Sequence, residues 1–205
     1  MQRYFKKAWI KRKPIKIIFE CSTHPSAQPP PSLLGKALSV HSYLYMLNVK
    51  IIATGNLKES YLRAAADEYR KRLGAWARVE EIELKEEKLP ENPSQSQIDL
   101  ALEKEAKAIF EKISNKSYVI AMCVEGKQLS SEELAAKISE VTTLGKSEIC
   151  FIIGSSFGLA PSVKQRADYK LSISKLTFPH QLLRVILYET TYRSLSIVNG
   201  TKYHK

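Results

Sequence analysis

Cysteine is scarce in this chain, and long apolar runs are missing from it. The three cysteines, Cys21, Cys123 and Cys150, are odd in number and widely separated, so they form neither a disulfide framework nor a metal-binding spacing. Cys123 and Cys150 stand in apolar runs, where cysteine behaves as a small hydrophobe. No stretch approaches the roughly 20 apolar residues that a membrane-spanning helix needs. We therefore expect a soluble, metal-free, cytoplasmic protein of a reducing compartment.

Acidic residues are scarce only at the beginning of the chain. The formal net charge of the 205 residues is +11. Residues 1–45 hold eight Lys and Arg against one acid, Glu20, hence +7, whereas residues 46–205 hold 24 against 20, hence +4. A body this mildly basic permits binding to a polyanion without demanding it, because nonspecific phosphate binding needs clustered lysines and arginines.

Residues 1–45 differ from the rest in composition. They contain five of the nine prolines and a basic cluster without sustained periodicity, so we expect weak order. Three explanations stay open: a basic organellar presequence, a nucleic-acid-binding arm, or translated sequence upstream of the true start. The prolines at 29–31 interrupt any amphipathic presequence helix. Met46 stands immediately before the first convincing strand, which favours the third explanation.

From Met46 onward, segments typical of strands and of helices alternate. The expected strands cover residues 48–54, 79–84, 117–124, 149–153 and 169–173. The expected helices cover residues 59–72, 98–113, 160–167 and 180–196, with one more that Ser130 opens through a capping box with Glu133 and Gly145 closes. This alternation predicts an α/β domain at residues 46–205, with a mostly parallel sheet and helices on both faces.

Residues 154–158 match G-x-S-x-G, the nucleophile elbow of serine hydrolases, with Ser156 as the candidate nucleophile. Asp168 and then His180 or His204 follow in the order that fold uses. Three fixed positions arise easily by chance, however, and no HGGG-like oxyanion segment is present. The plain alternative is that the two glycines only shape a turn.

A second segment, residues 172–180, mixes polar and apolar residues without helix or strand periodicity. It lies between an expected strand and a long expected helix, where binding residues concentrate. An apolar strand that enters a glycine turn, as at residues 149–158, is how α/β proteins present backbone groups to a ligand. We therefore expect a binding site in these two segments.

Over residues 46–205 the chain resembles the RlmH family, methyltransferases of the SPOUT class that act on N3 of a pseudouridine in large-subunit ribosomal RNA. The resemblance is carried by the turn at 151–159, the segment 171–180, the helix residues Glu189, Tyr192 and Arg193, and the ending Tyr203, His204 and Lys205. Together these features are far more specific than any one of them.

The resemblance implies a C-terminal trefoil knot, a rare exception to unknotted topology. It also implies that S-adenosylmethionine binds among the knot loops. The implied cofactor contacts are Met122, Gly154, Ile173, Ser174, Lys175, Leu176, Thr177 and Phe178. Backbone groups and apolar walls suit adenine, and Gly154 would let the chain pass close to the ligand. Ser155 departs from the family, which usually has a second glycine there, and it would be strained if the turn required a positive φ.

The implied substrate is a pseudouridine in helix 69 of 23S rRNA on the assembled ribosome, and the implied enzyme is a homodimer in which one subunit's tail reaches the other's cofactor. N3 of a uracil-type base is protonated at neutral pH, so methylation needs a base or stabilisation of the anion. The expected catalytic residues are His204, Tyr203 and Arg184, with His180 and Arg193 also open. Two alternatives remain: a cofactor-free RNA- or ribosome-binding relative, to which Ser155 points, and a serine hydrolase that uses Ser156.

Overall fold

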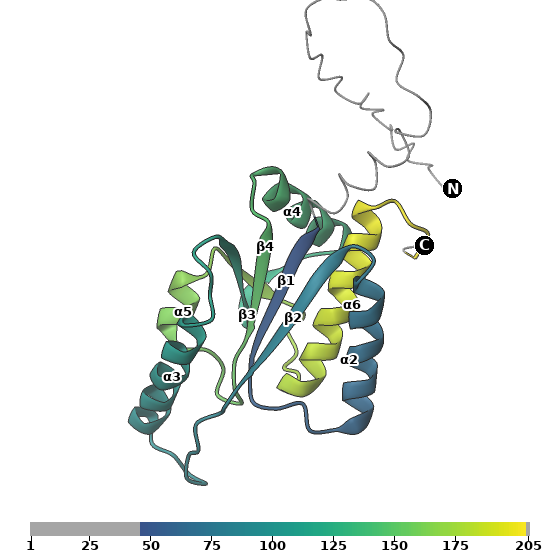
Figure 1. The fold of residues 1–205 in the computed structure, drawn as a ribbon. Helices are drawn as coiled ribbons and strands as arrows, with labels where there is room; N and C mark the ends of the chain where they lie inside the picture. Colours follow the sequence, from purple (N-terminus) through teal and green to yellow (C-terminus); the bar gives the residue numbers. More distant parts are fainter. Residues whose placement is uncertain (1–45, 204–205) are drawn as a thin grey trace, which may run out of the picture. The chain divides into compact units, whose positions relative to one another are not determined.

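Five strands form one sheet in which every neighbouring pair is parallel, in the order β2-β1-β4-β3-β5 (Figure 1). The structure, a computed structural model, describes residues 46–203 of the chain. Its strands are β1 (Leu47–Thr54), β2 (Ala77–Leu84), β3 (Ser117–Gln128), β4 (Glu148–Ile153) and β5 (Tyr169–Ser172). All five expected strands are confirmed. The expectations for residues 1–45 and for His204 concern residues outside the described range.

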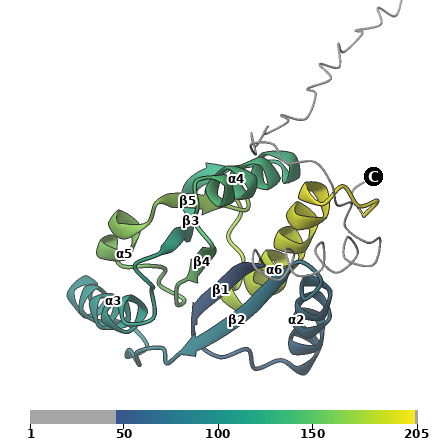
Figure 2. The same cartoon turned by 45° about the horizontal axis from the view of Figure 1, so that its top comes forward.

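Helices cover both faces of the sheet (Figures 1 and 2). They are α2 (Ser60–Leu73), α3 (Gln95–Phe110), α4 (Ser131–Thr143), α5 (Pro161–Arg166) and α6 (His180–Val198). Helices α2, α6 and α4 pack in a row on one face, whereas α3 and α5 pack together on the other. The expected α/β architecture is confirmed, and the trefoil knot remains a prediction. Within residues 46–203 no helix is long and apolar enough to cross a membrane.

Strand β4 shows why helices cover both faces of the sheet. It lies between β1 and β3, and its residues Ile149–Ile153 are all buried. Phe151 belongs to the core with α2, α4 and α6, whereas Cys150 and Ile152 belong to the core with α3 and α5. Successive side chains of a strand point to opposite faces, so a strand that is apolar on both needs a helix layer on each. Burial raises the pKa of Cys150 to about 12, which leaves its thiol unreactive.

Helix α4 begins where the capping box predicted. Ser130 Oγ accepts a hydrogen bond from the N–H of Glu133 at 3.2 Å, and the Glu133 carboxylate accepts one from the N–H of Ser130 at 2.8 Å. These two bonds satisfy backbone donors that the first helical turn leaves unpaired.

Strand β3 is longer than expected, because it continues past Val124 to Gln128. Its pairing with β5 shifts register between Met122 and Lys127. At Gly126 a Cβ atom would lie 2.7 Å from the carbonyl carbon of Leu171, so only a residue without a side chain lets β3 pass β5 this closely. A single glycine in a polar run carries no sequence signal of that contact.

Candidate functional site

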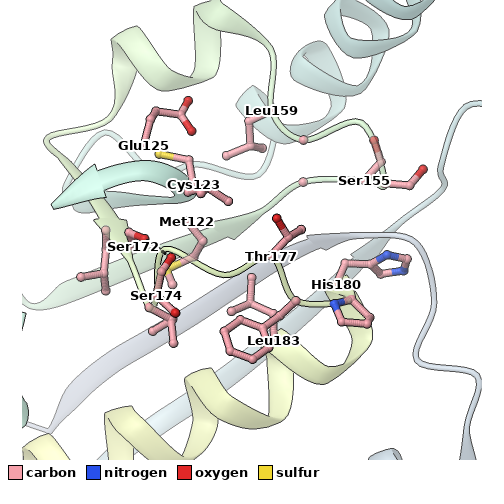
Figure 3. Close-up of a pocket in the computed structure, with 18 of the residues that line it drawn as sticks. Met122, Cys123, Glu125, Ser155, Leu159, Ser172, Ser174, Thr177, His180 and Leu183 are labelled. Atoms are coloured by element: carbon pink, nitrogen blue, oxygen red, sulfur yellow. Dashed lines mark hydrogen bonds between the residues drawn. The ribbon is translucent and has the colours of Figure 1, made fainter. Parts of the chain in front are cut away.

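A cavity of about 750 Å³ opens where strands β3, β4 and β5 end (Figure 3). Its walls come from residues 122–125 of β3, the loop between β4 and α5, the loop between β5 and α6, and the first turn of α6. Ligands of parallel α/β proteins bind at this edge of the sheet, in pockets of roughly 300–1,000 Å³. The turn at residues 154–158 and the segment 172–180 therefore line one cavity, as a shared binding site requires.

Seven of the eight residues expected to contact the cofactor line this cavity. They are Met122, Gly154, Ile173, Ser174, Leu176, Thr177 and Phe178. Lys175 is not part of the lining and is exposed to solvent. Contact between these residues and a cofactor stays a prediction, which their common location supports.

Gly154 is required by the turn that forms one wall. A Cβ atom at this position would lie 2.1 Å from the carbonyl oxygen of Gly158, far inside contact distance. Gly158 has a φ of +89°, which glycine adopts without strain, and its N–H donates to the carbonyl oxygen of Ser155 at 2.9 Å. We expected Gly154 to let the chain pass close to a ligand. The structure gives a different reason, because here the chain passes close to itself.

The loop between β5 and α6 is organised by its own serines. Ser172 Oγ donates to the carbonyl oxygen of Ser174 at 2.8 Å, and the N–H of Leu176 donates to Ser174 Oγ at 3.0 Å. Short-range bonds of this kind compete with regular secondary structure, which explains the missing periodicity. The loop thereby places Ile173 and Phe178 in the cavity wall.

The structure does not assemble the triad of a serine hydrolase. Ser156 Oγ donates to the carboxylate of Glu86 at 2.8 Å, not to a histidine. Asp168 precedes β5, at the opposite end of the sheet, where its carboxylate accepts the N–H of Val119 at 2.7 Å. A triad needs its serine, histidine and carboxylate in one hydrogen-bonded chain. The hydrolase hypothesis is therefore wrong.

His180 is a titratable residue of the cavity wall and the first residue of α6 (Figure 3). Its imidazole and the carboxylate of Glu86 both face Gly55, since a Cβ atom there would lie 3.2 Å from His180 Nε2 and 3.5 Å from Glu86 Oε2. Burial lowers the pKa of His180, and the positive charges of Arg184 and Lys58 lower it further. The charge of Glu86 opposes that lowering of the pKa. The imidazole is therefore neutral at neutral pH and able to accept a proton.

Arg184 is fully buried and does not line the cavity. Its guanidinium donates to the carboxylates of Glu83 at 2.5 Å and Glu81 at 3.5 Å, and also to the carbonyl oxygen of Gly55. Burial opposes ionisation of Glu83, but the N–H of Leu57 and the charge of Arg184 together hold the pKa of this carboxyl below its usual value. Arg184 was expected among the catalytic residues. Its position instead ties α6 to the ends of β1 and β2, and does not support direct contact with a substrate.

Tyr203 lies beyond the far end of α6. Its hydroxyl donates to Glu189 at 3.2 Å, and its ring meets the ring of Tyr192 edge-on, with centroids 4.7 Å apart. The guanidinium of Arg193 lies 4.9 Å from the same ring. Burial is the main reason that the pKa of Tyr203 rises to about 12. The structure thus joins Tyr203 to Glu189, Tyr192 and Arg193 and does not bring it to the cavity of the same chain.

Two carboxylates at the site were missed by the sequence analysis. Glu86 accepts both the N–H and the O–H of Ser156, at 3.2 and 2.8 Å. Glu105 is buried in α3 and accepts the N–H of Glu87 at 3.0 Å. Burial raises the pKa of Glu105, and hydrogen bonds from Glu87 and from the side chain of Ser155 oppose that rise. No spacing in the sequence distinguishes these glutamates from solvated ones.

The cavity combines apolar side chains with backbone groups that end three strands. Met122, Leu159, Ile173 and Phe178 supply apolar surface, and the nearby carboxylate of Glu125 is paired with Lys164 at 2.5 Å. Such a wall can hold a flat aromatic base, whose edge the loop backbone can bind. Fold and site therefore define an α/β protein whose cavity is lined by loops and not by a glycine-rich phosphate motif.

Known proteins place the chain in a family. The family described as "Predicted SPOUT methyltransferase" matches residues 47–204. Proteins named ribosomal RNA large subunit methyltransferase H match over 159 residues, which is 78% of this chain and 100% of each relative. Identity is 49% for the relative in Clostridioides difficile (strain 630), 48% in Bacillus pumilus (strain SAFR-032) and 46% in Limosilactobacillus reuteri (strain DSM 20016). A solved structure of a probable methylase family protein from Haemophilus influenzae Rd KW20 covers 79% of this chain and 71% of that chain with 15% identity and a TM-score of 0.44, which is too distant to carry an argument.

The chain belongs to the SPOUT methyltransferase family and is a methyltransferase. Within that family its place is with the proteins named ribosomal RNA large subunit methyltransferase H, as the sequence resemblance predicted.

Proposed function

We propose that this protein transfers a methyl group from S-adenosylmethionine to N3 of a pseudouridine in helix 69 of large-subunit ribosomal RNA, on the assembled ribosome. The relatives named above are ribosomal RNA large subunit methyltransferases, which supports an RNA acceptor. The identity of the cofactor, the acceptor nitrogen N3 and the location in helix 69 of the RNA are parts of this proposal.

One observation carries the proposal for the cofactor. A single cavity gathers seven of the eight residues that the resemblance assigns to S-adenosylmethionine, although they come from three separate parts of the chain. Its volume of about 750 Å³ and its apolar wall suit a nucleoside-containing ligand.

When bound, S-adenosylmethionine supplies an electrophilic methyl group on a sulfonium. Methyl transfer is an in-line displacement, so the protein must align donor and acceptor and leave a lone pair on the acceptor nitrogen. Met122, Ile173 and Phe178 would exclude water from the adenine side of the cavity. His180, neutral and in the cavity wall, is the residue of this chain best placed to accept the N3 proton.

We also propose that the protein acts as a homodimer in which the tail of one copy serves the cavity of the other. Tyr203 supports this arrangement, because it packs against Glu189, Tyr192 and Arg193 of α6 and does not line the cavity of its own chain. His204, the residue that follows, would enter the partner's cavity with it. Doubling a mildly basic body would also strengthen its binding to RNA.

The first test is calorimetric titration of S-adenosylmethionine and S-adenosylhomocysteine into the full-length protein. Saturable binding that Gly154→Arg abolishes is expected, because any side chain at Gly154 collides with the carbonyl of Gly158. Ribosomes that lack the modification are then offered with cofactor labelled in its methyl group, and the labelled nucleotide is located in the RNA.

The cofactor-free alternative predicts a different pair of results. If the folded protein binds ribosomes but binds neither S-adenosylmethionine nor S-adenosylhomocysteine, the proposed enzymatic function is wrong and an RNA-binding relative is favoured. Ser155, which motivated that alternative, is buried in the cavity wall, and its carbonyl oxygen accepts the N–H of Gly158 at 2.9 Å, so the structure accommodates it at this turn.

A further inference from the structure

Hydrogen bonds join the loop after β2 to the loop after β4 beside the cavity, although the two loops are distant in sequence. Glu86 and Glu87 lie in the loop after β2, and Ser155 and Ser156 lie in the loop after β4. The carboxylate of Glu86 accepts two bonds from Ser156, although 70 residues separate them. The N–H of Glu87 donates to the buried carboxyl of Glu105 at 3.0 Å.

The cavity wall needs such support at this point. Ser155 and Leu159 are buried at the two ends of the turn, but residues 156–158 between them are exposed. No apolar packing can therefore hold the middle of the turn. One carboxylate oxygen of Glu86, Oε1, accepts hydrogen bonds from both the backbone N–H and the hydroxyl of Ser156, the first exposed residue of the turn. The other carboxylate oxygen of Glu86 faces Gly55 and the imidazole of His180.

We propose that Glu86 is a positioning residue of the cavity: its carboxylate holds the turn at residues 155–158 in the shape that the ligand requires. Bonds to a charged acceptor are stronger than neutral ones, which suits a turn that packing does not fix. This inference rests on the proposed function, because it assigns the cavity to S-adenosylmethionine.

The chain offers a matched control for this contact. Ser162 of α5 donates to the carboxylate of Glu103 of α3, at 3.1 Å to each oxygen, and neither residue lines the cavity. Ser162→Ala therefore removes a serine–glutamate bond of the same kind, between α5 and α3, without touching the cavity wall. Glu86→Gln keeps a carbonyl oxygen that can accept both bonds from Ser156, whereas Glu86→Ala removes the acceptor.

The experiment measures two properties of the full-length protein and its three variants. The first is amide hydrogen exchange of residues 155–158 without ligand, and the second is calorimetric affinity for S-adenosylhomocysteine. We expect Glu86→Ala to accelerate exchange and to weaken affinity, each by about tenfold or more, because both bonds from Ser156 lose their charged acceptor. Glu86→Gln should stay within about threefold of the unaltered protein on both. Ser162→Ala should change neither.

Each contrary result has a distinct meaning. Unchanged exchange in Glu86→Ala would overturn the role of Glu86 in holding the turn. Faster exchange with unchanged affinity would show that the ligand does not need the turn held, which overturns the positioning role. If the unaltered protein binds no S-adenosylhomocysteine, the proposed function and the ligand part of this inference both fail, while exchange still decides whether Glu86 holds the turn.

Discussion

The two ends of helix α6 differ in kind, although the family resemblance assigned both to one catalytic site. At its beginning, His180 lines a concave cavity shaped by Gly154 and by carboxylates. Near its end, Tyr192 and Arg193 pack against the ring of Tyr203. Twelve residues separate His180 from Tyr192, about 18 Å along a helix axis. His180 and Tyr192 of one chain therefore lie too far apart to contact the same methyl group.

The largest expected effect separates the two arginines of α6. Arg184→Ala should lower the free energy of unfolding by about 3 kcal/mol, because it leaves the carboxylates of Glu81 and Glu83 near the core without their partner. Arg193→Ala should lower it by less than about 1 kcal/mol, because its pair with Glu189 is partly exposed. Urea denaturation measures both. Equal effects would contradict the assignment of Arg184 as a buried anchor.

The next effect compares two glycines. Gly154→Ala should weaken affinity for S-adenosylhomocysteine about 100-fold, or about 3 kcal/mol, because the turn has to open away from the new Cβ atom. Gly145→Ala is the control, since Gly145 has a φ of +81° but no atom within 4 Å of the added Cβ. It should destabilise the fold by about 1 kcal/mol and leave affinity unchanged. Normal binding by Gly154→Ala would refute the position of the cofactor.

A mixed-dimer experiment tests whether the two ends of α6 meet across copies. Gly154→Ala and Tyr203→Ala are each expected to inactivate a homodimer, one through the cavity and the other through the tail. Random mixing makes half of the dimers heterodimers, each with one intact pair of cavity and partner tail, so about a quarter of the full activity should return. The readout is methyl incorporation into ribosomal RNA. A mixture as inactive as its parents would show that the tail serves its own chain or no cavity at all.

The smallest effect is a pH dependence at the cavity end of α6. Because the folded pKa of His180 lies below its unfolded value, its contribution to stability is complete above the unfolded pKa and is lost as the pH falls through the folded one. Imidazole proton resonances measure this pKa directly. Glu86→Gln should lower the pKa of His180 further, because among residues 46–203 it removes the one nearby charge that raises this pKa. A rise in that variant would contradict the placement of Glu86 beside the imidazole.

Much of the fold was predictable because its signals are local. The apolar run at residues 149–153, the capping box at Ser130 and the glycine turn at 154–158 each act over a few residues, and the structure confirms their places. The family features at 171–180 likewise predicted one wall of the cavity. The extra length of β3 was missed, because it depends on Gly126 lying against the backbone of Leu171, which is distant in sequence.

The sequence by itself determined the α/β class, the order of strands and helices, and the two segments that line the cavity, because periodicity, caps and turn residues act on their neighbours. Tertiary structure alone decided three further points. It buried Arg184, packed Tyr203 against Glu189 in the middle of α6, and brought Glu86 to Ser156 across 70 residues. Contacts of this kind depend on how strands and helices pack. The type of a charged or polar residue in the sequence is the same whether its side chain contacts solvent, a buried partner or a ligand.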